Sequence, residues 1–382
     1  MELVYNEQIL KVRQSEIREF NDYAKSVGAN IILTLGEPDF DTPEMITKEA
    51  ILALEKHQTK YGPTLGFQSL REKIAQFETT KHNYPTTADE VIITHGSTEG
   101  LTTALFTILN PDDEVIIPTP AYPMYRQIVE FCKAKVITID TTSSNFQITK
   151  KALQNAITDK TKAIILTSPN NPTGSIYSDE TYEIIHKLLY NKPIFVICDE
   201  VYNQINYTSS TIGFTRYQDM KDGIIICQSY SKSYAMPGWR CGYLIASKDF
   251  CKQAMKIHQY MIVALNTFIQ PAMEKALEFD SKEMVKSYQT RRDYVYNRLT
   301  QMGLDVMLPD GAFYIFPSIE KYHLSSMEFC KMFAEKYKVA IIPGCCFEAD
   351  QYIRISYCVD FETIKIACDR LEQFLNELKH FS

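Results

Sequence analysis

Seven short apolar runs, separated by longer segments of helical period, constrain the fold of this chain more than any other feature. They lie at residues 91–94, 114–118, 135–139, 163–167, 194–198, 224–227 and 242–246. Each run is almost continuously apolar, whereas a strand with one face in water alternates apolar and polar positions. Continuous apolar strands suit a sheet that helices cover on both faces. We therefore predict that these runs form the sheet of a large α/β domain.

The connections and the C-terminal third indicate how the chain divides into domains. Between residues 98 and 109, apolar side chains recur at positions i, i+3, i+4 and i+7, which predicts a helix. After about residue 270 the pattern changes to a long helical segment that ends at Gly303, followed by short strands and a closing helix. We expect a large α/β domain over residues 41–280 and a smaller α+β domain formed by residues 1–40 and 281–382.

Composition and charge argue against several classes of protein. Hydrophobic residues make up 45% of the chain and charged residues 23%, which is typical of globular proteins. The net charge of −7 offers no basic surface to nucleic acid or to an anionic membrane, and no run approaches the roughly 18 apolar residues of a membrane span. The N-terminus carries Glu2 and Glu7 and does not resemble a signal peptide. Ten scattered cysteines, without a CxxC pair or an HExxH motif, indicate a reduced cytoplasmic protein with no metal site.

Polar residues follow several of the predicted strands, at the edge where parallel sheets bind their ligands. Ser97 and Thr98 begin a helix, where hydroxyls, free N–H groups and the helix dipole attract an anion, although both residue types are also ordinary N-caps. Asp199 directly follows the run at 194–198, and a buried carboxylate requires a cationic partner unless it caps a helix. Because the chain has only 14 glycines, a phosphate site cannot depend on a long glycine-rich loop.

Lys232 follows the run at 224–227 among serines and tyrosines, and Arg240 comes eight residues later. Most lysines are solvated surface charges. An amine held in a crevice beside a second cation, however, has a lowered pKa and becomes a nucleophile toward an aldehyde.

In this order and spacing, the motifs resemble the class I and II pyridoxal-phosphate aminotransferases of the aspartate aminotransferase superfamily, which have fold type I. The resemblance rests on LTLGEPDFDTP (33–43), KYGPTLGFQSLRE (60–72), PTPAYPMY (118–125), SPNNPTG (168–174), CDEVY (198–202), SYSKSYAMPGWRCGY (229–243), GAFYIFP (311–317) and YIRISY (352–357). The segments SEIREF and KIHQY are most similar to the branch of aromatic and N-acetyl-diaminopimelate aminotransferases. The resemblance implies a mostly parallel seven-stranded sheet with helices on both faces, plus a smaller α+β domain.

The resemblance also implies pyridoxal 5′-phosphate as the cofactor and assigns its ring to residues at the strand ends. Lys232 would form the internal aldimine with the cofactor aldehyde and then carry the proton between substrate and cofactor. Asp199 would face the pyridine nitrogen and keep it protonated. Tyr202 would donate to the phenolic oxygen of the ring, with Asn171 beside it, and Tyr122 would stack on the ring face.

Further residues are implied for the phosphate and for the substrate. The phosphate would be held by Ser97, Thr98, Ser229, Ser231 and Arg240. Tyr61 would reach that phosphate from the neighbouring subunit, which implies a homodimer with shared active sites. Arg354 would bind the substrate α-carboxylate through two parallel hydrogen bonds, helped by Asn171 and the backbone of Gly36.

The implied reaction is a ping-pong transfer of an amino group from an L-amino acid to a 2-oxo acid. Two alternatives share the cofactor: a β-eliminating C–S lyase on the same scaffold, and a cofactor-binding regulator, against which the intact set of site residues argues. A dicarboxylate substrate would need a second cation, for which Arg13, Arg18 and Arg126 are candidates. Cys345 and Cys346 stand where the branch usually has a small hydroxyl residue and a different follower, and they either reshape the substrate wall or only pack.

Overall fold

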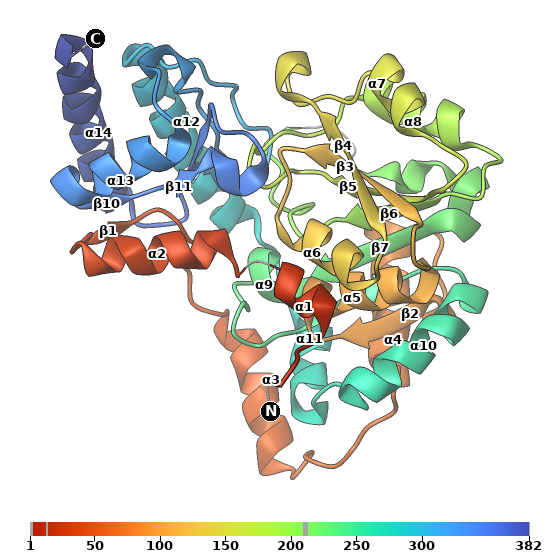
Figure 1. The fold of residues 1–382 in the computed structure, drawn as a ribbon. Helices are drawn as coiled ribbons and strands as arrows, with labels where there is room; N and C mark the ends of the chain where they lie inside the picture. The colour runs from red at the N-terminus through yellow and green to blue at the C-terminus, as the bar shows by residue number, and fades with distance from the viewer. Residues whose placement is uncertain (1–2, 13, 209–212, 382) are drawn as a thin grey trace.

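A computed structural model describes residues 3–12, 14–208 and 213–381 of the protein. Its largest sheet has seven strands in the order β2-β8-β7-β6-β5-β3-β4 (Figure 1). These strands are β2 (Val91–Thr94), β3 (Glu114–Thr119), β4 (Lys135–Asp140), β5 (Thr161–Thr167), β6 (Phe195–Asp199), β7 (Ile224–Ser229) and β8 (Gly242–Ile245). Strand β8 is antiparallel to both of its neighbours, β2 and β7, and the other neighbouring pairs in this sheet are parallel. Each apolar run forms one strand, which confirms the predicted α/β fold.

Helices cover both faces of this sheet, and the side chains of each inner strand alternate between two cores. In β5, Ile164 and Leu166 pack in one core, whereas Ala163 and Ile165 pack in the other. The first core includes α3 (Glu44–Glu55), α4 (Gln68–Lys81), α7 (Lys150–Ala156), α8 (Asp179–Leu189) and α11 (Gln270–Ala276). The second includes α5 (Gly96–Ile108), α6 (Met124–Phe131) and α10 (Lys248–Ile262). The edge strand β4 follows the same pattern, since Ile139 packs in the first core and Val136 packs against the second, although Thr138 is exposed.

A third core joins the N-terminal segment to the C-terminal third of the chain. Its helices are α2 (Glu16–Ser26), α12 (Lys282–Gln301), α13 (Ser326–Tyr337) and α14 (Phe361–Phe381). Strand β1 (Ile31–Ile32) pairs in parallel with β10 (Val339–Ala340), and β11 (Ile342–Pro343), β12 (Ile353–Ser356) and β9 (Tyr314–Ile315) form an antiparallel sheet. Figure 1 shows these red and blue elements beside the large sheet. Because Tyr202 and Ile205 also belong to this core, the division at residues 41–280 stays a proposal.

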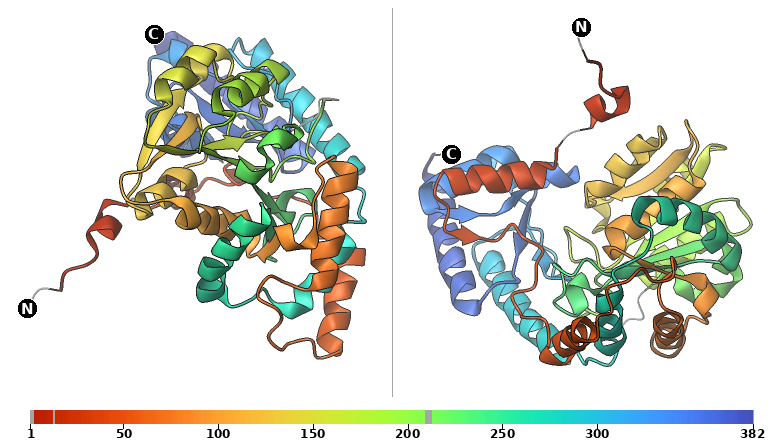
Figure 2. Two further views of the ribbon diagram at one scale, coloured as in Figure 1. Left: turned by 90° about the vertical axis from the view of Figure 1, so that its right-hand side faces the viewer. Right: turned by 90° about the horizontal axis from the view of Figure 1, so that it is seen from below.

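The N-terminal residues project from the rest of the chain in both views of Figure 2. They include the short helix α1 (Glu7–Lys11) and the exposed side chains of Leu3, Val4, Tyr5 and Leu10. Among the described residues, no helix has both the length and the apolar character that crossing a membrane requires.

Gly242 allows the start of α5 to lie directly against the sheet. It pairs with Thr94 on one side and with Ser229 on the other. A Cβ atom at this position would meet the backbone oxygen of Gln228 at 2.3 Å and the Cα of Gly96 at 2.9 Å. Because both neighbours are backbone atoms, they cannot rotate out of the way.

We predict that Gly242→Ala destabilises the protein by about 1–3 kcal/mol, because an extra methyl group in a packed interior displaces the backbone. Thermal and urea unfolding at equal protein concentration will measure the loss. Gly223→Ala is the matched control, since its Cβ would meet only the Ile194 oxygen at an ordinary 3.6 Å. A Gly242→Ala protein as stable as this control would contradict the prediction.

Candidate active site

The carboxyl ends of three neighbouring strands and the start of α5 bring most of the predicted site residues to one edge of the sheet. Asn171 follows β5, Asp199 ends β6, and Lys232 lies in the short helix α9 (Tyr230–Ser233) after β7. Arg354 comes from β12 on the other side of the site. The site therefore lies where the large sheet meets the third core.

The amine of Lys232 is held in a largely buried position. Its Nζ donates a hydrogen bond to the backbone oxygen of Gly36. Burial is the main cause that lowers the pKa of Lys232 to about 8, and the positive charges of Arg354 and Arg240 act in the same direction. An amine with this pKa is partly uncharged near neutral pH and is able to attack a carbonyl carbon.

Asp199 is 4% exposed and has one carboxylate oxygen without a hydrogen-bond partner. Its Oδ2 accepts a hydrogen bond from the Tyr125 hydroxyl at 2.6 Å, whereas Oδ1 has none. Burial raises the pKa of Asp199 to about 6, and the hydrogen bond from Tyr125, the backbone N–H of Val201 and the charge of Lys232 oppose this rise. A buried oxygen that lacks a donor fits a cationic N–H group, which a protonated pyridine provides.

The start of α5, the end of β7 and Arg240 form a site suited to an anion. Gly96 has a φ of +73° and lies so close to Arg240 that a Cβ there would meet Nη2 at 3.1 Å. Ser97 and Thr98 follow in the first turn of α5. The Ser229 hydroxyl accepts from the Ser231 amide at 3.1 Å and donates to its hydroxyl at 2.9 Å. A helix start, hydroxyl groups and a guanidinium are the donors that a phosphate requires.

Arg354 is 3% exposed and lies between two aromatic rings. Its guanidinium carbon is 4.5 Å from the centre of the Tyr314 ring and 4.9 Å from that of Phe347. Nη1 donates to Asn171 Oδ1 at 2.8 Å, and Nη2 donates to the Thr34 oxygen at 2.5 Å. Nε is buried without an acceptor, so a donor remains for a carboxylate.

Two tyrosines that the family resemblance assigns to the cofactor ring lie near these groups. The hydroxyl of Tyr202 is 2.7 Å from that of Tyr314. The ring of Tyr122 packs edge-on against Tyr125 at 5.9 Å, and the charges of Arg354 and Asp199 both affect its pKa, which burial raises. Tyr61, by contrast, is 90% exposed in the segment between α3 and α4.

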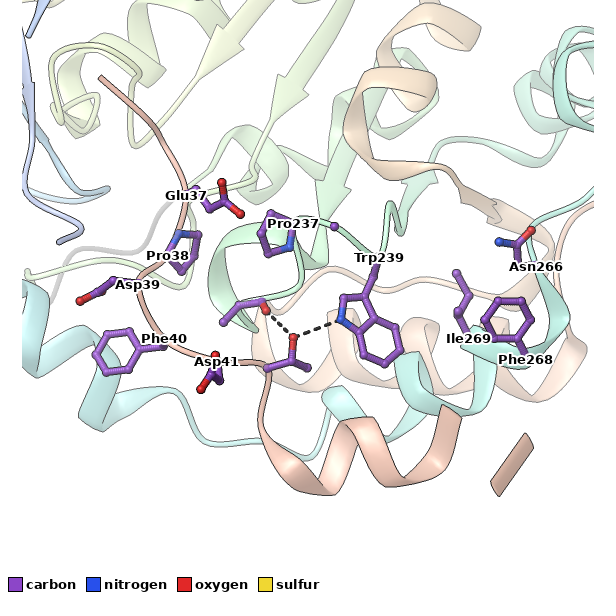
Figure 3. A pocket seen from close by; sticks show the side chains of 13 residues that line it. Glu37, Pro38, Asp39, Phe40, Asp41, Pro237, Trp239, Asn266, Phe268 and Ile269 are labelled. Carbon is purple, nitrogen blue, oxygen red and sulfur yellow. Dashed lines mark hydrogen bonds between the residues drawn. The ribbon is translucent and has the colours of Figure 1, made fainter. Parts of the chain in front are cut away.

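A cavity of about 620 Å³ lies beside the site (Figure 3). In its wall, the Thr42 hydroxyl donates to the Ala235 oxygen at 2.6 Å and accepts from Trp239 Nε1 at 3.1 Å. These bonds attach the segment that carries Gly36 to the loop between Lys232 and Arg240. No group of three or more potential metal ligands occurs among the described residues.

The structure also places the residues that the sequence leaves open. Arg126 forms an ion pair with Glu348 at 2.7 Å and is not a free cation, whereas Arg18 is exposed on α2. Arg13 lies outside the described residues.

A hydrogen bond with Cys346 is the main cause that lowers the pKa of Cys345 to about 7. Both cysteines lie in the short helix Gly344–Phe347, and the ring of Phe347 packs against the guanidinium of Arg354.

Sequence reasoning missed Tyr125 and Tyr314, whose hydroxyls contact Asp199 and Tyr202, and Thr167, whose hydroxyl contacts that of Tyr125. A signal for Tyr125 exists, because it lies three positions after Tyr122 at the start of a helix and therefore near the same edge of the sheet.

Comparisons with known proteins agree with the geometry. Residues 30–371 match the family model described as aminotransferase class I and II. The chain is 37% identical to a probable N-acetyl-LL-diaminopimelate aminotransferase of Bacillus subtilis, over 98% of this chain and 96% of that one. It is 35% identical to an aromatic-amino-acid aminotransferase of Thermococcus litoralis, over 99% and 100%. The crystal structure of an aspartate aminotransferase from Thermotoga maritima superposes with a TM-score of 0.94 at 34% identity, over 97% of this chain and 100% of that one.

We predict that Lys232 reacts with amine reagents at an unusually low pH. The uncharged amine is the reactive form, so its labelling increases with pH through a midpoint near 8 in place of the ordinary 10.5. Brief labelling of the full chain, freed of cofactor, with acetic anhydride and peptide mass spectrometry will measure the midpoint. Lys252 is the control, because its hydrogen bond to Asp249 raises its pKa. A midpoint for Lys232 above that of Lys252 would contradict the prediction.

Proposed function

From the premise that this chain belongs to the class I and II aminotransferase family, we propose that Lys232, Asp199 and Arg354 are the centre of its active site. The protein is a pyridoxal-phosphate-dependent aminotransferase, which moves an amino group from an amino acid to a 2-oxo acid. One observation carries the assignment of residues: a largely buried amine with a pKa of about 8 lies at the same edge of the sheet as a buried carboxylate oxygen that has no donor.

The residues at the strand ends fit the parts of this cofactor. The phosphate would be held by Ser97, Thr98, Ser229, Ser231 and Arg240. Oδ1 of Asp199 would accept from the pyridine nitrogen, and Tyr122 would cover the ring. Tyr202 and Asn171 would contact the phenolic oxygen. When bound, pyridoxal phosphate supplies an aldehyde for amine exchange and a ring that takes up the electron pair of the broken Cα–H bond.

The protein residues then bind the substrate and move its proton. Arg354 binds the α-carboxylate and, with Asn171 and the backbone of Gly36, fixes which bond at Cα is cleaved. Lys232 Nζ removes the proton from Cα of the amino acid and, in the second half of the transfer, returns a proton to Cα of the 2-oxo acid. An amine with a pKa near 8 is suited to both steps. The relatives carry aminotransferase names, and no observation favours the lyase or the regulator.

We also propose a homodimer in which Tyr61 completes the partner's site. Tyr61 is 90% exposed, and further large apolar side chains of the same subunit are exposed at Tyr260, Met261 and Val263. The projecting N-terminal residues, with Leu3, Val4 and Tyr5 exposed, offer a second apolar surface. Surfaces of this kind mark protein contacts.

All ten cysteines are free, which supports a reducing cytoplasmic location.

Lys232→Ala tests the proposed role of the amine. We expect amino transfer to fall by at least about 100-fold, because the variant loses the group that moves the proton. Circular dichroism will check folding, and borohydride reduction of the native protein followed by peptide mapping will locate the bound cofactor. Lys187→Ala, on the exposed face of α8, is the control. Wild-type turnover in Lys232→Ala, or a reduced adduct on another peptide, would overturn the assignment.

Mixed dimers test the proposed sharing of Tyr61. When Tyr61→Phe subunits are combined with Lys232→Ala subunits, one site of each heterodimer has the native residue at both positions if Tyr61 crosses to the partner. We expect such heterodimers to recover about half of the wild-type activity at limiting cofactor, whereas Tyr61→Phe homodimers bind cofactor roughly tenfold more weakly. If the heterodimers instead bind cofactor as weakly as Tyr61→Phe homodimers, Tyr61 acts within its own subunit.

A further inference from the structure

Tyr125 is the only side chain among the described residues that donates a hydrogen bond to Asp199. Its ring is 2% exposed and packs in the core between α5, α6 and the sheet. Its hydroxyl lies 2.6 Å from Asp199 Oδ2 and 2.8 Å from Thr167 Oγ1. None of these contacts follows from the roles assigned above.

The direction of each hydrogen bond in this group is fixed by elimination. An ionised carboxylate only accepts, so the single hydrogen of Tyr125 points to Asp199. The Thr167 hydroxyl must then donate to Tyr125. Thr167 and Asp199 are paired residues on the adjacent strands β5 and β6, so the sheet itself sets the spacing of the three groups. Burial and the nearby Asp199 raise the pKa of Tyr125 well above 10, which keeps its proton on the hydroxyl.

We propose that Tyr125 is a positioning residue that holds Oδ2 of Asp199 and thereby presents Oδ1 to the ring nitrogen of the cofactor. This inference rests on the proposed role of Asp199. A carboxylate rotates readily about its last bond, so without a donor either oxygen could turn away from the ring. With Tyr125 in place, the two oxygens have separate partners. The hydrogen bond also favours the ionised form of the acid, against the effect of burial.

The test compares two cofactors that differ at one ring atom. Pyridoxal phosphate and its analogue with a carbon in place of the ring nitrogen are titrated into the full chain freed of cofactor. Trp239, the only tryptophan, lies beside the site and reports binding by its fluorescence. We expect Tyr125→Phe to weaken binding of pyridoxal phosphate roughly tenfold and to leave binding of the analogue nearly unchanged.

Two further variants make the result specific. Thr167→Val keeps the bond from Tyr125 to Asp199 but removes the donor that orients it, so we expect a smaller loss in the same direction. Tyr288→Phe is the control, because it also removes a buried hydroxyl, one that has no hydrogen-bond partner, and it should affect neither titration. Equal losses for both cofactors in Tyr125→Phe would show a merely structural role and overturn the proposal.

Asp199→Ala separates the proposal from the function on which it rests. If Asp199 contacts the ring nitrogen, this variant loses the preference of the wild-type protein for pyridoxal phosphate over the analogue. If Asp199→Ala retains that preference, the role of Asp199 itself is wrong, and the role of Tyr125 fails with it. If Asp199→Ala loses the preference and Tyr125→Phe retains it, only the role of Tyr125 is overturned.

Discussion

The carboxylate of Asp199, buried at the end of β6, imposes the requirement that the rest of the site meets. A buried charge is costly unless a cation or donors compensate it. Tyr125 compensates one oxygen from α6, and Lys232 contributes a favourable charge from the turn after β7. Because β5, β6 and β7 are neighbours in the sheet, Thr167, Asp199 and the segment before Lys232 are held by backbone hydrogen bonds. The chemistry is therefore positioned by three neighbouring strands within the large sheet.

The residue that would bind the substrate depends on a different set of contacts. Arg354 belongs to the third core, where Tyr314 and Phe347 cover the two faces of its guanidinium. Its partners Thr34 and Asn171 come from the N-terminal segment and from the loop after β5. These contacts join the two parts of the molecule across the site. The position that a substrate on Arg354 would take relative to the sheet consequently depends on how the third core packs against the large sheet.

The sequence predicts what is local or what ends a strand, and it misses what depends on contacts between distant side chains. The seven strands follow from apolar runs, Asp199 from its place directly after one run, and Lys232 from its place in the polar segment after another. The pairing of Tyr202 with Tyr314 joins residues 112 positions apart, so no spacing signals it. Likewise, Arg126 has the charge that a dicarboxylate site would need, but Glu348 from the third core already neutralises it. The exposure of Thr138 depends on the place of β4 at the edge of the sheet, which the apolar run itself does not encode.

The proposed anion site shows how a chain with few glycines would hold a phosphate without a glycine-rich loop. Glu99 accepts the His95 amide at 2.7 Å, just before α5 begins, and its other oxygen lies 2.7 Å from His258 Nδ1. His258 is fully buried in α10, and its Nε2 is 2.7 Å from the Thr64 oxygen. The helix start and the segment that carries Tyr61 are thus held by one buried polar network. The partners of a buried network stabilise each other. The hydrogen bonds of Glu99 and His258 therefore hold the start of α5 in place without a glycine-rich loop.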